Sequence, residues 1–315
     1  MARYASMLAM VPAKTLGEGD TPLIEISQGL YVKAEYLNPS GSFKDRGASL
    51  CVTHACMHGY STIVEDTSGN TGIALSMYAA RCGMRMRVVV PRDAPEGKVK
   101  LLRLLGAEVV FAEDRGSASR IARELASLGE YYASHLTNPL FIEGPRTIAY
   151  EIYEQLGEID NVVVPVGSGG LVLGIAYGFQ DLLKLGLIRR IPRIVAVQRC
   201  DVAPLYRAIY GLKEPGGDAW LADGIRVPDP PRLNEIANVV KHSMGEVILV
   251  NNEDIVKALS ELVEMGILVE PTAATAFAAY TKLRDKLAGS TVVVLTGSGS
   301  KMLSDLESIL RRTPR

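Results

Sequence analysis

Residues 161–171 read NVVVPVGSGGL, and this stretch decides the fold. The run 161–166 is rich in valine and shows no polar alternation, which is typical of a strand buried on both faces of a parallel sheet. A glycine-rich turn follows directly, and a helix-like apolar run begins near Leu171. A buried strand, a tight turn and a helix in this order predict one strand–helix unit of an open α/β sheet.

The same alternation of strands and helices continues along most of the chain. Further strands are predicted at 30–34, 61–65, 87–90, 108–111, 193–198 and 291–295, and further helices at 72–81, 97–105, 117–128 and 147–156. We therefore expect an α/β protein with two open, mostly parallel twisted sheets and flanking helices. Residues 204–231 are rich in Gly, Pro and Asp and predict an irregular segment near the mouth of a site.

The composition is that of a globular protein and argues against several kinds of partner. The 315 residues carry 34 Lys and Arg against 35 Asp and Glu, which gives a net charge of -1. Nucleic acids and anionic membranes select clustered positive charge, so we expect neither as a partner. The cysteines number 4, too few for a disulfide-stapled secreted scaffold. No apolar run reaches the ~18 residues of a membrane span, and we expect a cytoplasmic protein.

Two turns in the first half of the chain carry residues that suit a binding site. The turn 38–47 reads NPSGSFKDRG and places Lys44 in the first turn of a predicted helix. A helix N-terminus disfavours a second positive charge and so favours a nucleophilic lysine, although a surface lysine is the alternative. The turn 67–72 reads TSGNTG. Its hydroxyl and backbone N–H groups suit a carboxylate or a phosphate, and an ordinary N-cap is the alternative.

Two glycine-rich turns in the second half, GSGGL at 167–171 and TGSGSK at 296–301, also follow strands. Glycines let backbone N–H groups approach a phosphate, so we interpret 167–171 as a phosphate cup rather than a plain tight turn. Neither turn completes the dinucleotide pattern GxGxxG, which fails at Val172 and Met302. A lysine able to form a Schiff base, a phosphate cup and a carboxylate site together predict an enzyme that uses pyridoxal 5'-phosphate (PLP).

The four motifs, in this order and spacing, resemble the fold-type II PLP enzymes, a group that includes threonine synthase, cysteine synthase, threonine dehydratase and tryptophan synthase β. The resemblance runs from GDTPL at 19–23 to TGSG at 296–299. The chain is most similar to the threonine synthase branch, through NPSGSFKDRGA at 38–48, EGPRTIAYE at 143–151 and EPTAA at 270–274. The cup GSGGL and the segment GSGSK depart from that branch and leave the substrate open.

The resemblance implies a role for each matching residue. Lys44 would hold PLP as a Schiff base and act as the main acid and base. Asn70 would hydrogen-bond the ring hydroxyl, and Thr296 would face the pyridine nitrogen. The phosphate of the cofactor would lie against Gly167, Ser168, Gly169, Gly170 and Leu171. The substrate carboxylate would be held by Thr67, Ser68, Asn70 and Thr71.

The implied reaction is that of threonine synthase, which converts O-phosphohomoserine and water to threonine and phosphate by γ-elimination and β-addition. The substrate phosphate would then contact Arg46 and Arg146, with Asn138 and Ser300 as lesser candidates, and a structural ion pair is the alternative for each arginine. The open alternatives are β-replacement or β-elimination on serine, threonine or an activated serine, and more remotely a non-catalytic PLP-fold regulatory protein.

The resemblance also implies the domain organisation. Residues 36–145 would form a smaller domain that carries Lys44 and the SGNTG loop. Residues 1–35 and 146–315 would form a larger domain that binds the PLP phosphate, and the protein would be a homodimer with a small amino-acid substrate. The Cys and His residues at 51–58 match no zinc-site spacing, so we expect packing or surface positions there and no metal.

Overall fold

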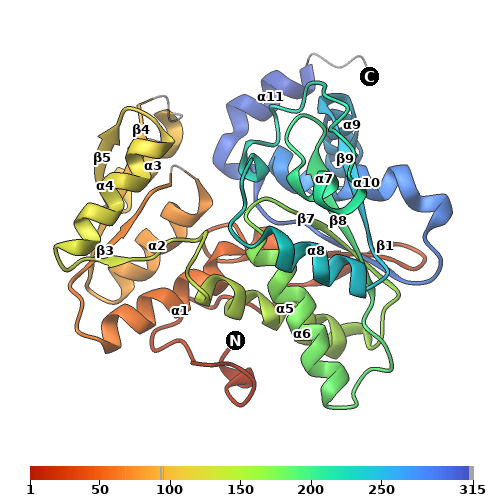
Figure 1. Cartoon of the computed structure of the whole chain (residues 1–315), viewed down its shortest axis with the longest axis horizontal. Helices are drawn as coiled ribbons and strands as arrows, with labels where there is room; N and C mark the ends of the chain where they lie inside the picture. Colours follow the sequence, from red (N-terminus) through yellow and green to blue (C-terminus); the bar gives the residue numbers. More distant parts are fainter. Residues whose placement is uncertain (68, 93, 95, 312–315) are drawn as a thin grey trace. The chain divides into compact units, whose positions relative to one another are not determined.

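The computed structural model describes residues 1–67, 69–92, 94 and 96–311, and the chain divides into two compact units. The first unit consists of residues 1–19 and 38–144, and the second of residues 20–37 and the chain from 145 onward. Each unit contains one sheet, and both sheets are wholly or mostly parallel (Figure 1). The predicted α/β fold with two open sheets is thereby confirmed. Across the described ranges, no helix is long and apolar enough to cross a membrane.

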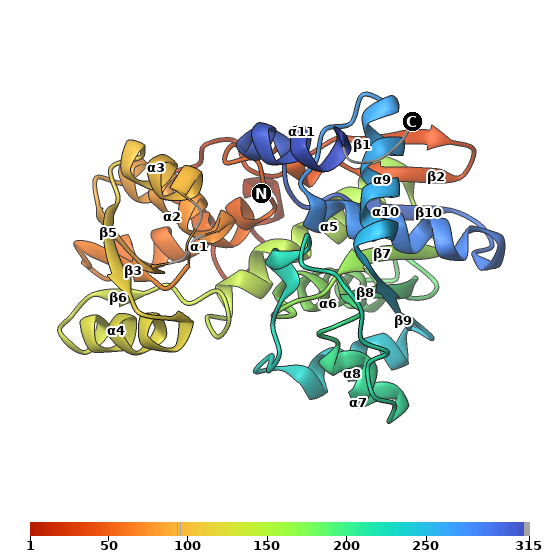
Figure 2. The same ribbon diagram turned by 90° about the horizontal axis from the view of Figure 1, so that it is seen from above.

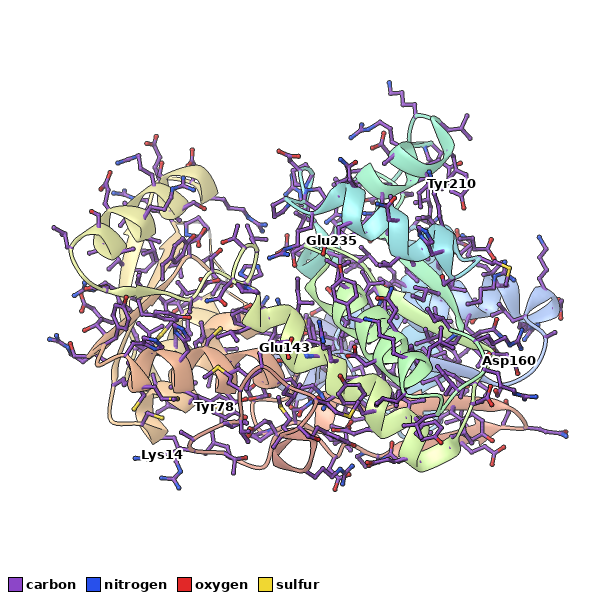
Figure 3. The ribbon with its side chains drawn as sticks, turned by 60° about the horizontal axis from the view of Figure 1, so that its bottom comes forward. Lys14, Tyr78, Glu143, Asp160, Tyr210 and Glu235 are labelled. Atoms are coloured by element: carbon purple, nitrogen blue, oxygen red, sulfur yellow. The ribbon has the colours of Figure 1, made fainter. Side chains whose placement is uncertain are left out.

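The first 19 residues belong to the first unit, whereas the expected division placed them in the larger domain. Two long-range hydrogen bonds explain the difference, and they involve Glu143 and Tyr78, whose side chains Figure 3 labels. The Ala9 amide donates to Glu143 Oε1 at 2.7 Å, and the Tyr78 hydroxyl donates to Glu18 Oε2 at 3.0 Å. The other expected boundaries, at 36 and 145, lie within two residues of the observed ones.

The first unit is built on a four-stranded parallel sheet in the order β5-β4-β3-β6. The strands are β3 (Thr62–Glu65), β4 (Arg85–Pro91), β5 (Glu108–Ala112) and β6 (Tyr131–Tyr132). Along β4, Val88 and Val90 pack with α1 (Lys44–Met57), α2 (Asn70–Arg81) and α3 (Glu96–Leu104). Val89 packs with α4 (Arg115–Ser127) instead, because successive strand residues point to opposite faces (Figure 2).

The second unit is built on a six-stranded sheet in the order β1-β2-β10-β7-β8-β9, in which only β1 runs antiparallel to its neighbour. The strands are β1 (Leu23–Ser27), β2 (Leu30–Lys33), β7 (Asn161–Pro165), β8 (Arg193–Arg199), β9 (Glu246–Val250) and β10 (Thr291–Val294). Val163 and Val293 pack with α9 (Asn252–Glu264) and α10 (Pro271–Leu283) on one face. Helices α6 (Gly170–Lys184) and α8 (Leu233–His242) contact β7 and β8 respectively.

The remaining elements connect these layers. They are α5 (Leu140–Leu156), α7 (Pro204–Tyr210), α11 (Leu303–Arg311) and the short 3-10 helices at Ala2–Tyr4, Glu35–Leu37, Asp223–Ile225, Arg284–Lys286 and Gly299–Met302. Helix α5 crosses the boundary between the units and contains Pro145. The segment expected to be irregular, 204–231, contains one short α-helix and one 3-10 helix and is otherwise irregular.

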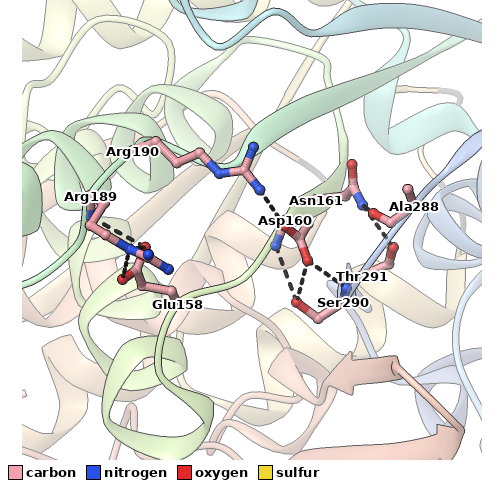
Figure 4. Close-up of polar contacts among 8 residues, drawn as sticks. All are labelled: Glu158, Asp160, Asn161, Arg189, Arg190, Ala288, Ser290 and Thr291. Atoms are coloured by element: carbon pink, nitrogen blue, oxygen red, sulfur yellow. Dashed lines mark hydrogen bonds and ion pairs between the residues drawn. The ribbon is translucent and has the colours of Figure 1, made fainter.

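Strands β7 and β10 are neighbours, with Val163 opposite Val293, and a polar network holds their amino ends together (Figure 4). The Asp160 carboxylate accepts from the Ser290 amide at 2.8 Å. The Asn161 side chain donates to the Ala288 carbonyl at 2.9 Å and to Thr291 Oγ1 at 3.2 Å. Since this network and the buried valines fix the register, the turns that follow the two strands begin at the same sheet edge.

A buried ion pair ties the second unit together near its antiparallel edge. Lys33 Nζ lies 2.8 Å from Glu151 Oε2, and both side chains are 0% exposed. Lys33 also donates to the Thr21 carbonyl at 2.6 Å and to Gln155 Oε1 at 2.9 Å. Glu151 Oε1 accepts from the Asp20 amide at 2.8 Å. The network therefore joins β2, α5 and the segment that enters β1.

Removing one partner of this pair should destabilise the second unit strongly. Glu151→Gln is expected to lower the free energy of unfolding by about 3 kcal/mol, because the Lys33 ammonium stays buried without its counter-charge. Urea denaturation followed by circular dichroism measures the loss as a lower midpoint at constant m value. The control is Glu264→Gln on an exposed part of α9, expected to change stability by less than ~0.5 kcal/mol. Similar midpoints for the two variants would contradict the assignment.

Candidate active site

Lys44 is the first residue of α1, as the sequence predicts, and its side chain is half-buried. Its Nζ lies 5.1 Å from the centre of the Phe43 ring and 5.9 Å from that of the Phe141 ring. The turn before α1 is fixed by Asp45, whose Oδ2 accepts from the Ser40 amide at 3.1 Å and from the Ser40 hydroxyl at 2.6 Å. An amine between aromatic rings at the start of a helix is well placed for attack on a carbonyl ligand.

The SGNTG turn leads into α2, which begins at Asn70. The N-cap residue is Gly69, which has no side chain to cap the first amides of the helix. The Gly69 amide donates to Thr67 Oγ1 at 3.1 Å, and a Cβ at Gly72 would meet Thr67 Cγ2 at 3.1 Å. The turn is therefore packed tightly against a helix start, where amides and the helix dipole favour an anion.

The described residues among those predicted to hold the substrate carboxylate lie together at this turn. Thr67 and Asn70 are half-buried, and Thr71 is 2% exposed in the first turn of α2. Ser68 lies outside the described residues. Their role toward a carboxylate stays a prediction.

The phosphate cup lies in the second unit, between β7 and α6. Gly169 has a φ of +95°, which L side chains rarely adopt, and a Cβ there would meet Ile236 Cδ1 at 2.2 Å. A Cβ at Gly167 would lie 3.0 Å from Ile225 Cα. Since the N-cap is Gly169, no side chain of that residue caps α6, whose first residues are Gly170 and Leu171. The backbone of 167–171, called the cradle below, therefore requires glycine at 169, and its position at the start of α6 suits an anion.

Thr296 follows β10 and is 2% exposed. Among the described residues, its Oγ1 has no hydrogen-bond partner. An unsatisfied buried hydroxyl costs about 1–3 kcal/mol, so a ligand atom is expected to accept from it. The turn is fixed by Glu270, whose amide donates to the Gly297 carbonyl at 3.0 Å. Ser300 is exposed, unlike the buried Thr296, and its Oγ lies 2.8 Å from that of Ser298.

These features fit PLP. The amide cradle suits its phosphate, the orphaned Thr296 hydroxyl suits its pyridine nitrogen, and the Lys44 amine suits its aldehyde carbon. Lys44 belongs to the first unit, whereas the glycine-rich turn and Thr296 belong to the second.

Besides Ser300, three residues are predicted to bind a substrate phosphate, and each of them is buried or already contacts other residues of the chain. Arg46 is 0% exposed. Arg146 Nη1 lies 3.1 Å from Asp181 Oδ2, and the side chain of Arg146 is 26% exposed. Asn138 donates through Nδ2 to the Tyr131 hydroxyl at 2.8 Å. A phosphate would have to join or displace these contacts, and its assignment to these residues stays a prediction.

The fold and the residues described above are compatible with a PLP-dependent enzyme, and comparisons with known proteins show the family. The sequence matches the family described as pyridoxal-phosphate dependent enzyme over residues 14–299. Threonine synthase from Methanosarcina acetivorans is 31% identical over 98% of this chain and 81% of its own length. The chain therefore belongs to the PLP-dependent enzyme family, as a fold-type II lyase, and the predictions of family and cofactor are confirmed.

Solved structures of the same fold include enzymes with different reactions. O-ureido-L-serine synthase matches with a TM-score of 0.76 and 25% identity, covering 94% of this chain and 93% of its own. Serine racemase from Dictyostelium discoideum matches with a TM-score of 0.76 and 27% identity, covering 89% and 92%. The fold is therefore well determined, while the particular reaction is not fixed by similarity of structure.

Two functional candidates escape the motif analysis, namely Glu65 at the end of β3 and His135 after β6. The backbone amide of His135 donates to Glu65 Oε1 at 3.2 Å, and its Nδ1 lies 2.5 Å from the same oxygen. The only signal in the sequence is a carboxylate directly after the apolar residues Ile63 and Val64, at the end of the predicted strand STIVE. Nothing in the sequence points to His135.

The Cys and His residues at 51–58 divide between packing and surface positions, since Cys51 is buried, His54 is half-buried, and Cys56 and His58 are exposed. The rings of His54 and His58 stack with their centroids 4.1 Å apart. Cys51 is buried, and burial raises the pKa of its thiol well above the usual value. In the part of the chain that the structure describes, no group of three or more His, Cys, Asp or Glu is placed to hold a metal ion.

Gly169→Ala tests the cradle. The new Cβ would meet Ile236 and would strain a φ of +95°, so the amides must move and PLP affinity is expected to fall at least about tenfold. Spectroscopic titration of the cofactor-free chain with PLP measures the affinity. Gly186→Ala is the matched control, because its φ is +71° but its Cβ would meet nothing within 4 Å. Equal PLP affinities for the two variants would refute the cradle.

Thr296→Val tests the orphaned hydroxyl. The cofactor-free chain should be at least as stable as wild type, because among the described residues the buried hydroxyl has no partner to lose. PLP binding should weaken about fivefold, the loss of one hydrogen bond of about 1 kcal/mol. Thr291→Val is the control: Thr291 Oγ1 accepts from Asn161 at 3.2 Å, so this variant should lose stability and keep its PLP affinity. The reverse pattern would contradict the assignment of Thr296.

Proposed function

We propose that the chain is a threonine synthase of amino-acid biosynthesis, which converts O-phosphohomoserine and water to threonine and phosphate. The observation that carries the proposal is the similarity to curated threonine synthases over almost the whole chain. The NPSGSFKDRGA turn around Lys44 supports it from the sequence. Bound PLP supplies an electron sink for negative charge at the α-carbon of the substrate.

Lys44 and the SGNTG turn bind and activate the amino acid in this proposal. Lys44 Nζ removes a proton from the α-carbon and then one from the β-carbon, a task for a positioned base of suitable pKa. Thr67, Asn70, Thr71 and the first amides of α2 bind the substrate carboxylate, and Ser68 shares that role. Asn70 also orients the cofactor through its ring hydroxyl.

The second unit holds and orients the cofactor. The backbone of 167–171, including that of Ser168, binds the phosphate, and Thr296 Oγ1 donates to the pyridine nitrogen. A hydroxyl donor leaves that nitrogen without a proton of its own. For the substrate phosphate we retain Arg46, Arg146, Asn138 and Ser300. Among them only Arg46 is fully buried, whereas Asn138 and Arg146 are partly exposed and Ser300 is exposed, which favours these three as first contacts.

A second candidate is β-replacement or β-elimination on serine, threonine or an activated serine. The observation that favours it is the similarity to solved structures of O-ureido-L-serine synthase and serine racemase. The phosphate cup GSGGL is closer to the GGGGL type of dehydratases and serine racemase than to the cup of threonine synthases. The two candidates share the cofactor site and differ only in what the substrate carries beyond its β-carbon.

The proposal includes a homodimer in the cytoplasm, for which the family resemblance is the support. Sedimentation velocity of the purified chain measures the mass directly. A mass near twice 34.0 kDa is the expected result.

O-phosphohomoserine decides between the two candidates. The purified holoenzyme is expected to release phosphate and threonine in equal amounts, and Lys44→Ala is expected to abolish both while the control Lys257→Ala, an exposed lysine of α9, retains them. Inorganic phosphate and threonine are measured together. No phosphate release, combined with 2-oxo acid formed from serine or threonine, would move the assignment to the second candidate.

A further inference from the structure

Glu65 and His135 form a buried acid–base pair in the first unit that the proposed reaction does not use. Glu65 is 0% exposed, while the side chain of His135 is 20% exposed. Glu65 Oε1 is shared by the backbone amide and Nδ1 of His135. Within the described residues, Glu65 Oε2 has no hydrogen-bond partner although it is buried. In a stable buried ion pair, both carboxylate oxygens would have hydrogen-bond partners. Because Glu65 Oε2 has none among the described residues, a permanent negative charge on this carboxyl group would be unfavourable.

The surroundings favour a neutral pair that holds a single proton. Burial, and next the neighbouring Asp66, raise the pKa of Glu65 well above its usual value. Burial, and next the Lys44 ammonium, lower the pKa of His135 well below its usual value. Asp66 itself accepts from the hydroxyls of Ser119 and Tyr132, which spread its charge. One proton shared between Glu65 Oε1 and His135 Nδ1 is consistent with both the raised pKa of Glu65 and the lowered pKa of His135.

The pair lies close to the lysine that the family uses for PLP. Lys44 Nζ is 5.9 Å from the centre of the Phe141 ring, and that ring meets the His135 ring edge-on with centroids 6.5 Å apart. The positive charge of Lys44 lowers the pKa of Glu65 as well as that of His135. Coupling between titrating groups is reciprocal, so ionisation of Glu65 must favour the charged form of Lys44 by the same free energy.

We propose that Glu65 and His135 act as a positioning pair that sets the charge of Lys44 by holding or releasing one proton. When the pair keeps its proton, Lys44 is favoured as a neutral amine that can act as nucleophile and base. When the pair releases the proton to water, the Glu65 carboxylate stabilises the Lys44 ammonium through space. The proposal rests on the proposed function only in taking Lys44 as the lysine that carries the cofactor and moves the substrate protons.

Several other titratable groups face the pair and must be considered in a pH experiment. Cys51 of α1 has its pKa raised, first by burial and then by Glu65. Tyr132 of β6 has its pKa raised, first by burial and then by Asp66. Both shifts keep these groups neutral in the ordinary range. The pH experiment near Lys44 therefore follows the charges of Glu65 and His135.

The test measures the protonation of Lys44 in the cofactor-free full chain. Trace acetylation with acetic anhydride at a series of pH values, followed by peptide mass spectrometry, gives the pH midpoint at which Lys44 becomes reactive. Glu65→Gln removes the only carboxylate of the pair and is expected to lower this midpoint by about one pH unit. His135→Gln retains a donor to Glu65 but cannot share its proton, so Glu65 ionises more readily and the midpoint is expected to rise.

Opposite shifts in the two variants are the signature of the pair, because a loss of local structure would move both in the same direction. Glu130→Gln is the control, a carboxylate of the same unit that pairs with Arg87, and it should leave the midpoint unchanged. Should Glu65→Gln not fold, His135→Gln decides alone. A higher pH midpoint for Lys44 in that variant would support the pair, and an unchanged midpoint would contradict it. Unchanged midpoints in folded variants would overturn the proposal.

A second readout uses the holoenzyme. The pH dependence of the visible absorbance of the lysine-bound cofactor is expected to shift in opposite directions in Glu65→Gln and His135→Gln. Neither measurement requires a substrate, so a failure of O-phosphohomoserine turnover would leave this inference standing. Conversely, wild-type titration curves in both variants would overturn it even if threonine were formed.

Discussion

The parallel pairing of β7 with β10 is the constraint on which the cofactor side of the second unit depends. Because Val163 lies opposite Val293, the two strands end at one edge of the sheet and their turns start side by side. The Asp160–Ser290 contact at the other end prevents a register slip, which would turn each valine to the opposite face. The positions of the cradle and of Thr296 therefore follow from buried valines that touch no ligand.

The helix starts show how local stability is exchanged for a binding site. Helix α9 is capped by Asn251 in a reciprocal capping box, and α4 is capped by Asp114. Helices α2 and α6 instead begin after Gly69 and Gly169, which bring no capping side chain. A glycine cap costs only a few tenths of a kcal/mol relative to asparagine. In return the first amides can face an anionic ligand, which is the property that PLP phosphate and a substrate carboxylate require.

The sequence predicts the sheets because they depend on local patterns, and the same patterns point to candidate cofactor residues whose roles stay predictions. Valine runs indicate buried strands, and glycine or hydroxyl residues after them indicate a site. Prediction fails where tertiary contacts decide. Helix α5 begins at Leu140, whereas the sequence predicts a start near 147 and Pro145 favours a break. Close packing holds the early turn of the helix in place, since a Cβ at Gly144 would meet the Arg46 carbonyl at 2.2 Å. Glu65 and His135 are 70 residues apart, and no local pattern joins them.

The chemistry of Thr296 and that of the Glu65–His135 pair bear on the same requirement. A hydroxyl that donates to the pyridine nitrogen leaves the ring uncharged, which makes it a weaker electron sink than a carboxylate partner would. The base must then lower more of the barrier to proton removal. Its ability to do so depends on its charge state at the working pH. A lysine beside a proton-holding pair can be kept neutral without being moved into an apolar core. Once Lys44 has taken a proton, the pair can release its own proton, and the Glu65 carboxylate then stabilises the Lys44 ammonium. This serves a reaction that moves protons at two carbons in turn.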